Sequence, residues 1–136
     1  MTNELPQKHV VTCFLECDAR ILILRRSQMV GSFQGRWAGV SGYVETTTDE
    51  QALIEIEEET GLCPEDVELV TKGSPLEAED EGIKWIVHPY LFRIKERDRV
   101  RIDWEHSEKR WIRPEDVDKY ETVPMLKEAL ALVYKP

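Results

Sequence analysis

Apolar and polar positions along the chain alternate in patterns that predict an α/β domain. Two apolar segments, 9–16 and 20–26, are separated by a short turn-like stretch and predict two strands paired as a hairpin. A longer segment, 83–94, is apolar on both faces, as expected of a strand in the middle of a sheet. The pattern also predicts shorter strands at 67–73, 99–103 and 108–112, an acidic loop at 74–82, and a closing amphipathic helix within 123–134.

The clearest helix is predicted directly after a glycine-rich loop. That loop, 31–45, contains four glycines and leads into a segment of helical character. Thr48 stands three residues before Gln51 and fits a capping box, while Thr47 is a one-residue alternative. Because a glycine follows the last helical position, the helix is expected to run from about residue 48 to 60.

Three glutamates of this helix fall on one arc of its surface. At about 100° per residue, Glu55, Glu58 and Glu59 follow the i, i+3, i+4 pattern beside the apolar arc that faces the sheet. A solvated face is the ordinary explanation for such a group. If the glycine loop shields the carboxylates from water, however, their repulsion favours binding of a divalent cation. Oxygen ligands on a rigid helix suit Mg²⁺ or Mn²⁺, so a solvated face and a metal site are both open.

Composition limits the class of protein. A chain of 136 residues with 41% hydrophobic residues predicts one domain, 1–136, with a single core. A net charge of -9 argues against binding of nucleic acid, which calls for a basic face. The sequence has no apolar run of bilayer length, and its first residues lack the order of a signal peptide, so we expect a cytoplasmic protein without a membrane partner.

The segment 37–62, WAGVSGYVETTTDEQALIEIEEETGL, resembles the Nudix box of the Nudix hydrolases. The pattern of that box is G-x5-E-x7-R-E-U-x-E-E-x-G-U, where U is aliphatic, and Gly42 corresponds to its first glycine. The second half is matched by Glu55, Ile56, Glu58, Glu59, Gly61 and Leu62. The resemblance covers almost the whole chain and implies the Nudix fold, an α/β/α sandwich with a mixed central β-sheet.

The box departs from the family pattern in three places. The interval from Gly42 to Leu62 is two residues shorter than the pattern requires. The first glutamate is missing: its position is Thr48 when counted from Gly42 and Thr46 when counted back from the helix. Ile54 replaces the arginine, which in the family is thought to orient the box by pairing with a glutamate. We expect Ile54 to pack against another loop or against a partner subunit.

The resemblance also implies a chemistry, the attack of water on a phosphorus of a diphosphate with Mg²⁺ as cofactor. By carry-over, Glu58 and Glu59 are metal ligands, and Glu55 is a ligand or the general base. A backbone carbonyl near Ser41 or Gly42 would complete the ligand set. The family often adds an acid from a distal loop. Glu105 or an acid of the segment 77–82 is a candidate, beside the simpler explanation of a solvated loop charge for each.

A nucleotide-type diphosphate is the substrate class that the resemblance implies. Arg25 and Arg26 end a strand beside the expected cleft and would hold phosphates, although strand-end arginines commonly face solvent. Trp37 and Tyr43 flank the glycine loop and would stack on a base, although packing is the more common role of such rings. Gly42, within the loop, is also expected to contact the substrate.

Two functions are open at this point. The favoured one is a Mg²⁺-dependent pyrophosphohydrolase, and the alternative is a nucleotide-binding or sensor module, which the missing arginine favours. An edge strand or an exposed Ile54 would suit a homodimer. The three histidines, His9, His88 and His106, have no zinc or triad spacing, and we expect structural roles for them.

Overall fold

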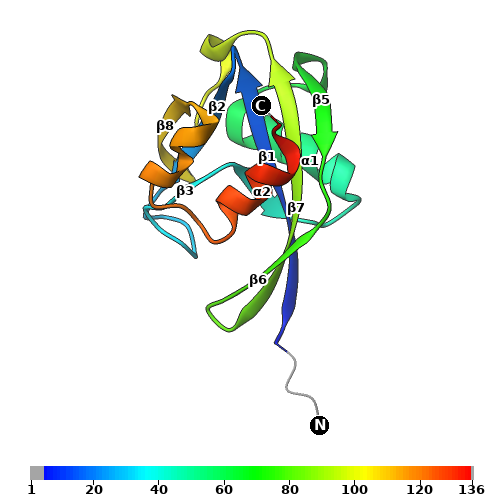
Figure 1. Cartoon of the computed structure of the whole chain (residues 1–136), viewed down its shortest axis with the longest axis vertical. Helices are drawn as coiled ribbons and strands as arrows, with labels where there is room; N and C mark the ends of the chain where they lie inside the picture. Colours follow the sequence, from blue (N-terminus) through cyan, green and yellow to red (C-terminus); the bar gives the residue numbers. More distant parts are fainter. Residues whose placement is uncertain (1–4, 136) are drawn as a thin grey trace.

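A mixed eight-stranded sheet forms the middle of the described part of the protein. The computed structural model describes residues 5–135, and residues 1–4 and 136 of the predicted 1–136 domain lie outside that part. The central path of the sheet is β3-β2-β1-β7-β5, and β4, β6 and β8 pair with β1, β7 and β2 (Figure 1). The strands are β1 (Gln7–Cys17), β2 (Arg20–Arg26), β3 (Trp37–Ala38), β4 (Val40–Tyr43), β5 (Val67–Lys72), β6 (Leu76–Asp80), β7 (Ile83–Ile94) and β8 (His106–Ile112).

The two longest strands, β1 and β7, lie side by side and parallel at the centre, while the other strand pairs are antiparallel. The predicted hairpin of β1 and β2 is confirmed, with Cys17 opposite Arg20 across a two-residue turn. Both residues of that turn, Asp18 and Ala19, have positive φ, which suits the twist of a tight hairpin. The amino-terminal end of β1 and the β6–β7 hairpin extend together below the rest of the domain in Figure 1.

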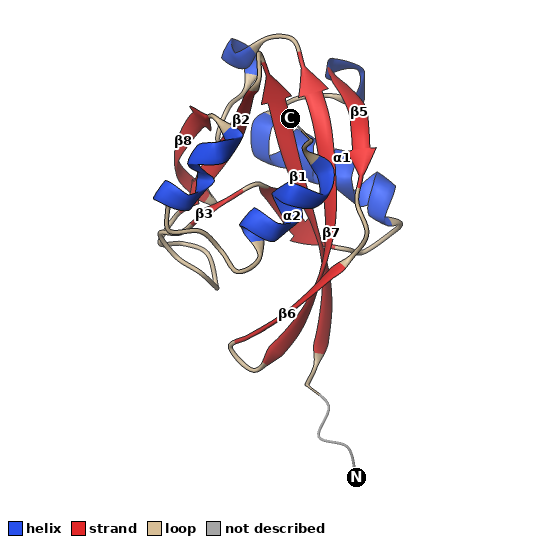
Figure 2. Ribbon diagram, in the orientation of Figure 1, coloured by secondary structure: helices blue, strands red, loops and turns tan. Residues whose placement is uncertain are grey.

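One helix covers each face of the sheet (Figure 2), so the predicted α/β/α sandwich is confirmed. Helix α1 (Thr48–Thr60) packs through Ala52 and Ile56 on one face, and helix α2 (Leu126–Val133) packs through Ala129 and Leu130 on the other. Short 3-10 helices occupy Pro64–Asp66, Arg97–Arg99 and Pro114–Lys119. Within residues 5–135, no helix has the length and apolar character needed to cross a bilayer.

The ends of α1 show why this helix is well specified by its sequence. Its predicted range is confirmed, but the first choice of cap was wrong, because Thr47 rather than Thr48 is the N-cap and accepts a hydrogen bond from the Glu50 backbone N–H. At the other end Gly61 has φ of 79° and donates its N–H to the Glu57 carbonyl. This left-handed cap is a position that glycine occupies without strain.

Two predicted segments were wrong. The expected acidic loop contains β6, which pairs antiparallel with the amino-terminal half of β7 through a tight turn at Glu81 and Gly82. The expected strand at 99–103 is instead irregular after the short helix Arg97–Arg99. In both cases strand pairing decided the outcome. Strand β7 pairs with β6, whereas no strand of the described residues pairs with 99–103.

Candidate functional site

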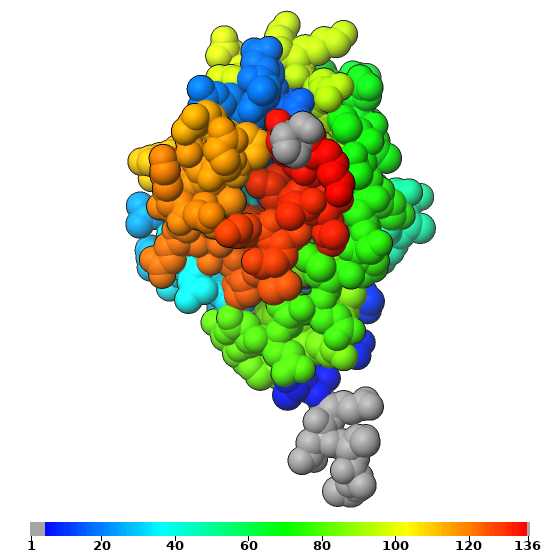
Figure 3. All heavy atoms as spheres, viewed as in Figure 1, coloured from blue at the N-terminus to red at the C-terminus, as the bar shows by residue number. Residues whose placement is uncertain are grey.

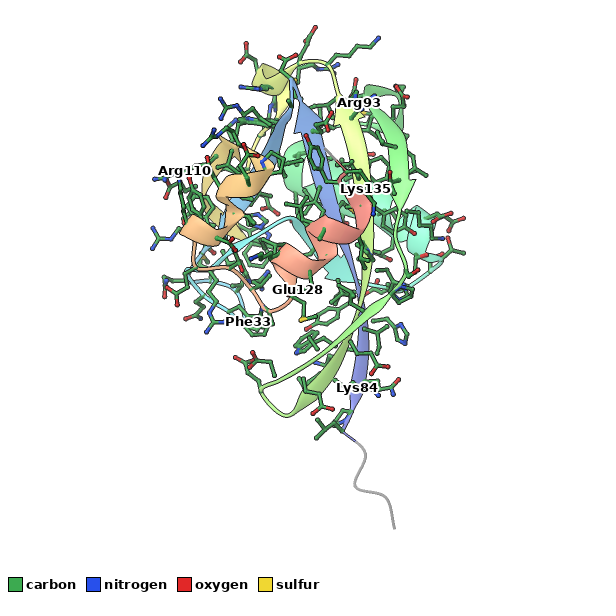
Figure 4. All side chains as sticks on the ribbon, in the orientation of Figure 1. Phe33, Lys84, Arg93, Arg110, Glu128 and Lys135 are labelled. Carbon is green, nitrogen blue, oxygen red and sulfur yellow. The ribbon has the colours of Figure 1, made fainter. Side chains whose placement is uncertain are left out.

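A cleft of about 920 Å³ lies beside the Glu-rich face of α1. Its walls come from α1, from the segment 26–33 that follows β2, from β4, and from the amino-terminal half of β7. Phe33, labelled in Figure 4, belongs to the segment between β2 and β3 and contacts the ring of Trp85 at a centroid distance of 5.9 Å. The cleft therefore has an acidic side on the helix and an aromatic side on the sheet extension, and it is large enough for a nucleotide.

Glu55 lies directly against the backbone of Gly42. A Cβ atom on Gly42 would come within 1.9 Å of the Glu55 Oε1 atom, so only glycine leaves room for this carboxylate. Gln51 donates from Nε2 to Glu55 Oε2 at 3.0 Å, and the Gln51 Oε1 atom accepts from the Glu45 backbone N–H. Burial raises the pKa of Glu55 to about 7, and the hydrogen bond from Gln51 opposes the shift. This geometry supports the alignment of Gly42 with the first glycine of the box.

Glu59 is more deeply buried than Glu55, with 2% of its surface exposed. Its Oε1 atom accepts a hydrogen bond from the Ser41 backbone N–H at 3.4 Å, and its Oε2 atom has no hydrogen-bond partner. Burial and the negative charges of Glu105 and Glu55 raise the pKa of this carboxyl well above its usual range. A buried carboxylate without a cation is unfavourable, so this position calls for a positive charge or a proton.

Sequence reasoning missed the part that His106 has in the site. His106 begins β8 and is buried, with its Nε2 atom 3.5 Å from Glu59 Oε1 and its Nδ1 atom 2.9 Å from Asp103 Oδ1. Burial lowers the pKa of the His106 ring, and the hydrogen bond with Asp103 opposes that shift. The contact joins residues that are 47 positions apart, so spacing in the sequence gave no sign of it.

Glu58 and Glu105 bring further carboxylates to the cleft. Both side chains line it, Glu58 from the exposed side of α1 and Glu105 from the loop before β8. Burial and the charge of Asp103 raise the pKa of Glu105, while the charge of Arg26 lowers it. The structure thus brings the three helix glutamates and the candidate acid of the distal loop to one place.

The predicted substrate-binding residues separate into two groups. Arg26 and Tyr43 line the cleft with Gly42. Arg25 is outside its lining and contacts Glu108 and the Gly35 carbonyl. Trp37 is buried in the opposite core, where it meets the ring of Tyr120 edge-on at 5.5 Å. The structure therefore offers Arg26 and Tyr43, and not Arg25 or Trp37, to a ligand in the cleft.

The aromatic side of the cleft was found only in part from the sequence. Tyr43, which is half exposed, stacks on Trp85 with 6.2 Å between ring centroids and 19° between planes. The ammonium group of Lys8 lies 5.2 Å from the Tyr43 ring and 5.8 Å from the Trp85 ring. We predicted Tyr43 from its place beside the glycine loop, whereas Lys8 and Trp85 join it through pairing of β1 with β4 and β7.

The predicted packing of Ile54 against another loop was wrong, and its packing against a partner subunit stays a prediction. Its side chain is 42% exposed and lines the cleft, so it is not covered by another loop of the described chain. The position therefore contributes an apolar group to the rim of the site, where the family pattern has an arginine.

The acidic residues supply part of a ligand set for a divalent cation. Within residues 5–135, no group of three or more His, Cys, Asp or Glu side chains could by itself hold a metal ion. The unpartnered Glu59 Oε2 atom and the mutual repulsion of Glu55 and Glu59 nevertheless fit a hard cation that binds oxygen. The donor set therefore suits Mg²⁺ or Mn²⁺ with water or substrate oxygens as further ligands.

These features define an α/β sandwich that places a carboxylate-rich helix over a glycine loop at the floor of a cleft. The chain belongs to the Nudix family, since the NUDIX domain profile matches residues 6–133. Proteins of this family are hydrolases that act on pyrophosphate bonds, and the family uses divalent metal ions in general. No curated protein matches the sequence significantly.

Solved structures share the fold at low sequence identity. The Ap4A hydrolase of C. elegans in a binary complex has a TM-score of 0.77 and 19% identity, with 91% of this chain and 93% of that chain covered. The MutT protein of Methanosarcina mazei Go1 has a TM-score of 0.76 and 22% identity, with 96% and 94% covered. The NUDIX domain of Shewanella oneidensis NrtR, complexed with ADP ribose, has a TM-score of 0.70 and 18% identity, with 92% and 86% covered. At these identities the likeness shows the fold.

Proposed function

We propose that this protein is a divalent-cation-dependent pyrophosphohydrolase that cleaves a diphosphate bond in a nucleotide. The observation that carries the proposal is the burial of two neighbouring acids: Glu55, which lines the cleft, lies against Gly42, and Glu59 accepts a hydrogen bond from the Ser41 backbone N–H. A solvated acidic face would leave these carboxylates in water, and a protein does not bury two acids together without a use or a compensating charge.

We assign roles to the carboxylates from their places in the family pattern of the box. Glu58 and Glu59 would hold Mg²⁺ or Mn²⁺, which when bound supplies charge stabilisation to phosphate oxygens and acidifies water. Glu55 is the general base that accepts the proton of the attacking water. Its Oε2 atom is occupied by Gln51, so Oε1, over the Gly42 backbone, is the atom free to take the proton.

The remaining side chains of the cleft bind and orient the substrate. Arg26 donates from Nε to the Ser32 carbonyl at 2.9 Å, which fixes the guanidinium at the side of the cleft where it can meet a phosphate. The Tyr43 ring, backed by Trp85, offers a flat surface on which a base can stack. The substrate would be a nucleoside diphosphate linked to another moiety, or a nucleoside triphosphate. Two of the proteins with this fold are an Ap4A hydrolase and a domain complexed with ADP ribose, in agreement with that range.

A second candidate function is nucleotide binding without cleavage, as in a sensor module. The observation that favours it is Ile54, since an exposed isoleucine cannot form the ion pair that the box arginine makes in the family. Both functions use the same cleft, so turnover rather than binding separates them.

The test is release of phosphate or nucleotide from nucleoside triphosphates, dinucleoside polyphosphates and nucleotide sugars. Each is assayed with Mg²⁺, with Mn²⁺ and with a chelator, for the wild type and for Glu59→Gln. We expect turnover that needs the cation and that falls by at least about 100-fold in Glu59→Gln, because that variant lacks a cation ligand. Nucleotide binding that needs the cation but gives no turnover across the panel would instead support the sensor module.

A further inference from the structure

A chain of three polar groups, of which His106 and Glu59 are buried and Asp103 is partly exposed, joins the loop before β8 to helix α1. The carboxylate of Asp103 contacts His106 Nδ1 at 2.9 Å, and His106 Nε2 faces Glu59 Oε1 at 3.5 Å. The side chains of His106 and Glu59 are each 1% exposed. A backbone hydrogen bond from the His106 N–H to the Asp103 carbonyl closes the turn and fixes the direction of the ring.

The contact with Asp103 determines which atom of the ring meets Glu59. An ionised carboxylate only accepts hydrogen bonds, so the Nδ1 atom carries the hydrogen and donates it to Asp103. In the neutral ring the Nε2 atom then presents its lone pair toward Glu59. His106 Nε2 and Glu59 Oε2 are both buried and without a hydrogen-bond partner. With Glu59 ionised, two electron-rich groups would face one another, so the contact requires either a cation or a proton between them.

Such an arrangement is typical of a metal-binding histidine. A histidine that binds a metal through one ring nitrogen usually donates the hydrogen of the other to a carboxylate or a carbonyl, which sets the tautomer and the ring orientation. Asp103 stands in that position here. Imidazole nitrogen suits first-row transition metals, whereas Mg²⁺ prefers an all-oxygen set.

We propose that His106 is a nitrogen ligand to the divalent cation that Glu59 holds, oriented by Asp103, and that it biases the site toward Mn²⁺ over Mg²⁺. The proposal rests on the assignment of Glu59 as a cation ligand in the proposed function. It adds a ligand from β8 that lies outside the box segment 37–62. The other two histidines, His9 and His88, contact each other on β1 and β7 and are outside the cleft lining.

The test is pulsed electron paramagnetic resonance of Mn²⁺ bound to the full chain without substrate. One sample has natural histidine and the other has histidine labelled with ¹⁵N. We expect ¹⁴N modulation of the Mn²⁺ signal that changes to a ¹⁵N pattern on labelling, since a directly bound imidazole couples to the metal. This comparison uses only the wild type and does not depend on whether a variant folds.

Variants then assign the coupling to one residue. In His106→Gln we expect the nitrogen modulation to disappear and the Mn²⁺ affinity to fall by about 10- to 100-fold, with a smaller change for Mg²⁺. His88→Gln is the matched control and should keep the signal. It removes a histidine of the same sheet whose ring contacts His9. Circular dichroism confirms that each variant is folded.

Bound Mn²⁺ without nitrogen coupling would overturn the proposal and leave a shared proton as the link between His106 and Glu59. The proposal that His106 is a cation ligand and the proposal that the protein is a hydrolase can be rejected independently. Cation-dependent turnover without nitrogen coupling overturns only the role of His106. Nitrogen coupling without turnover of any substrate in the panel supports the ligand and removes the hydrolase.

Discussion

The two faces of the sheet bury very different side chains. On α2, whose atoms lie toward the viewer in red in Figure 3, the buried residues are Leu126, Ala129, Leu130 and Val133, all apolar. On α1 the buried residues include Gln51, Glu55, Glu59 and Thr60. Within residues 5–135, four of the six buried polar residues thus belong to α1, whereas the buried side chains of α2 are all apolar.

The apolar contact between α1 and the sheet keeps the helix in place although the helix also buries acids. Ala52 and Ile56 of the same helix are fully buried against Val11, Leu15 and Tyr90 of the sheet. The carboxylates lie beside this contact, at its edge toward the glycine loop. Burial of the apolar arc therefore holds the helix in place, and the repulsion among the acids is a cost that the bound cation would relieve.

The largest effect on stability is expected on the α2 face. Leu130→Ala removes a buried side chain from the apolar core and should lower the free energy of unfolding by about 2 to 5 kcal/mol. Turnover per folded molecule should be unchanged, because Leu130 is outside the cleft lining. Urea denaturation and a steady-state assay measure the two quantities.

Leu132→Ala is the control for that variant, since Leu132 is on the same helix but is 38% exposed. A loss below about 0.5 kcal/mol is expected for it. Equal losses in the two leucine variants, or a fall in turnover that follows the loss of stability in Leu130→Ala, would break the division between the faces.

An effect of intermediate size is expected where the acids meet the glycine loop. In Gly42→Ala the new Cβ atom would come within 1.9 Å of Glu55 Oε1, so the carboxylate must move. We expect the turnover number to fall by about 10- to 100-fold, a range typical of a displaced catalytic group, while the fold is retained. Gly31→Ala is the matched control, because no atom lies within 4 Å of its Cβ position and it also lines the cleft. Normal turnover in Gly42→Ala would show that Glu55 is not a catalytic residue.

Local patterns were sufficient to predict most of the fold and the acidic part of the site. The range of α1 followed from its cap and its glycine, and the convergence of Glu55 and Glu59 followed from helical spacing. The strand β6 was missed because its charged sequence is typical of a loop, and pairing with β7 decided its structure.

The rest of the site depends on contacts between distant segments. His106 lies in a polar stretch, and only the approach of β8 to α1 buries it against Glu59. Trp37 fits a place beside a ligand by sequence, yet pairing of β3 with β2 turns its ring toward Tyr120 in the opposite core. Periodicity gives the face of a residue within its own element, and tertiary packing decides what that face meets.

The smallest effect is expected from a polar pair on the α1 face that is separate from the cleft. His9 Nδ1 and His88 Nε2 are 2.9 Å apart, and their rings stack at 5.2 Å. Burial, followed by the charges of His9 and Lys72, lowers the pKa of His88 in the folded protein. The unfolded chain therefore binds a proton to His88 at a higher pH than the folded chain does. Stability should decline as the pH falls below the ordinary histidine pKa of about 6.5, and this contribution should level off below the lowered folded pKa.

Urea denaturation of the wild type and of His88→Gln at several pH values between about 5 and 8 measures this contribution as the difference in slope. The variant should lose less stability on acidification, because it has no proton to gain at this position. Its turnover near neutral pH should match that of the wild type, since neither histidine lines the cleft. Parallel stability curves would show that the pair is indifferent to protonation. A loss of turnover would instead show that residues of the α1 face outside the cleft also contribute to function. The difference between the two faces would then involve more of the α1 face than its carboxylates.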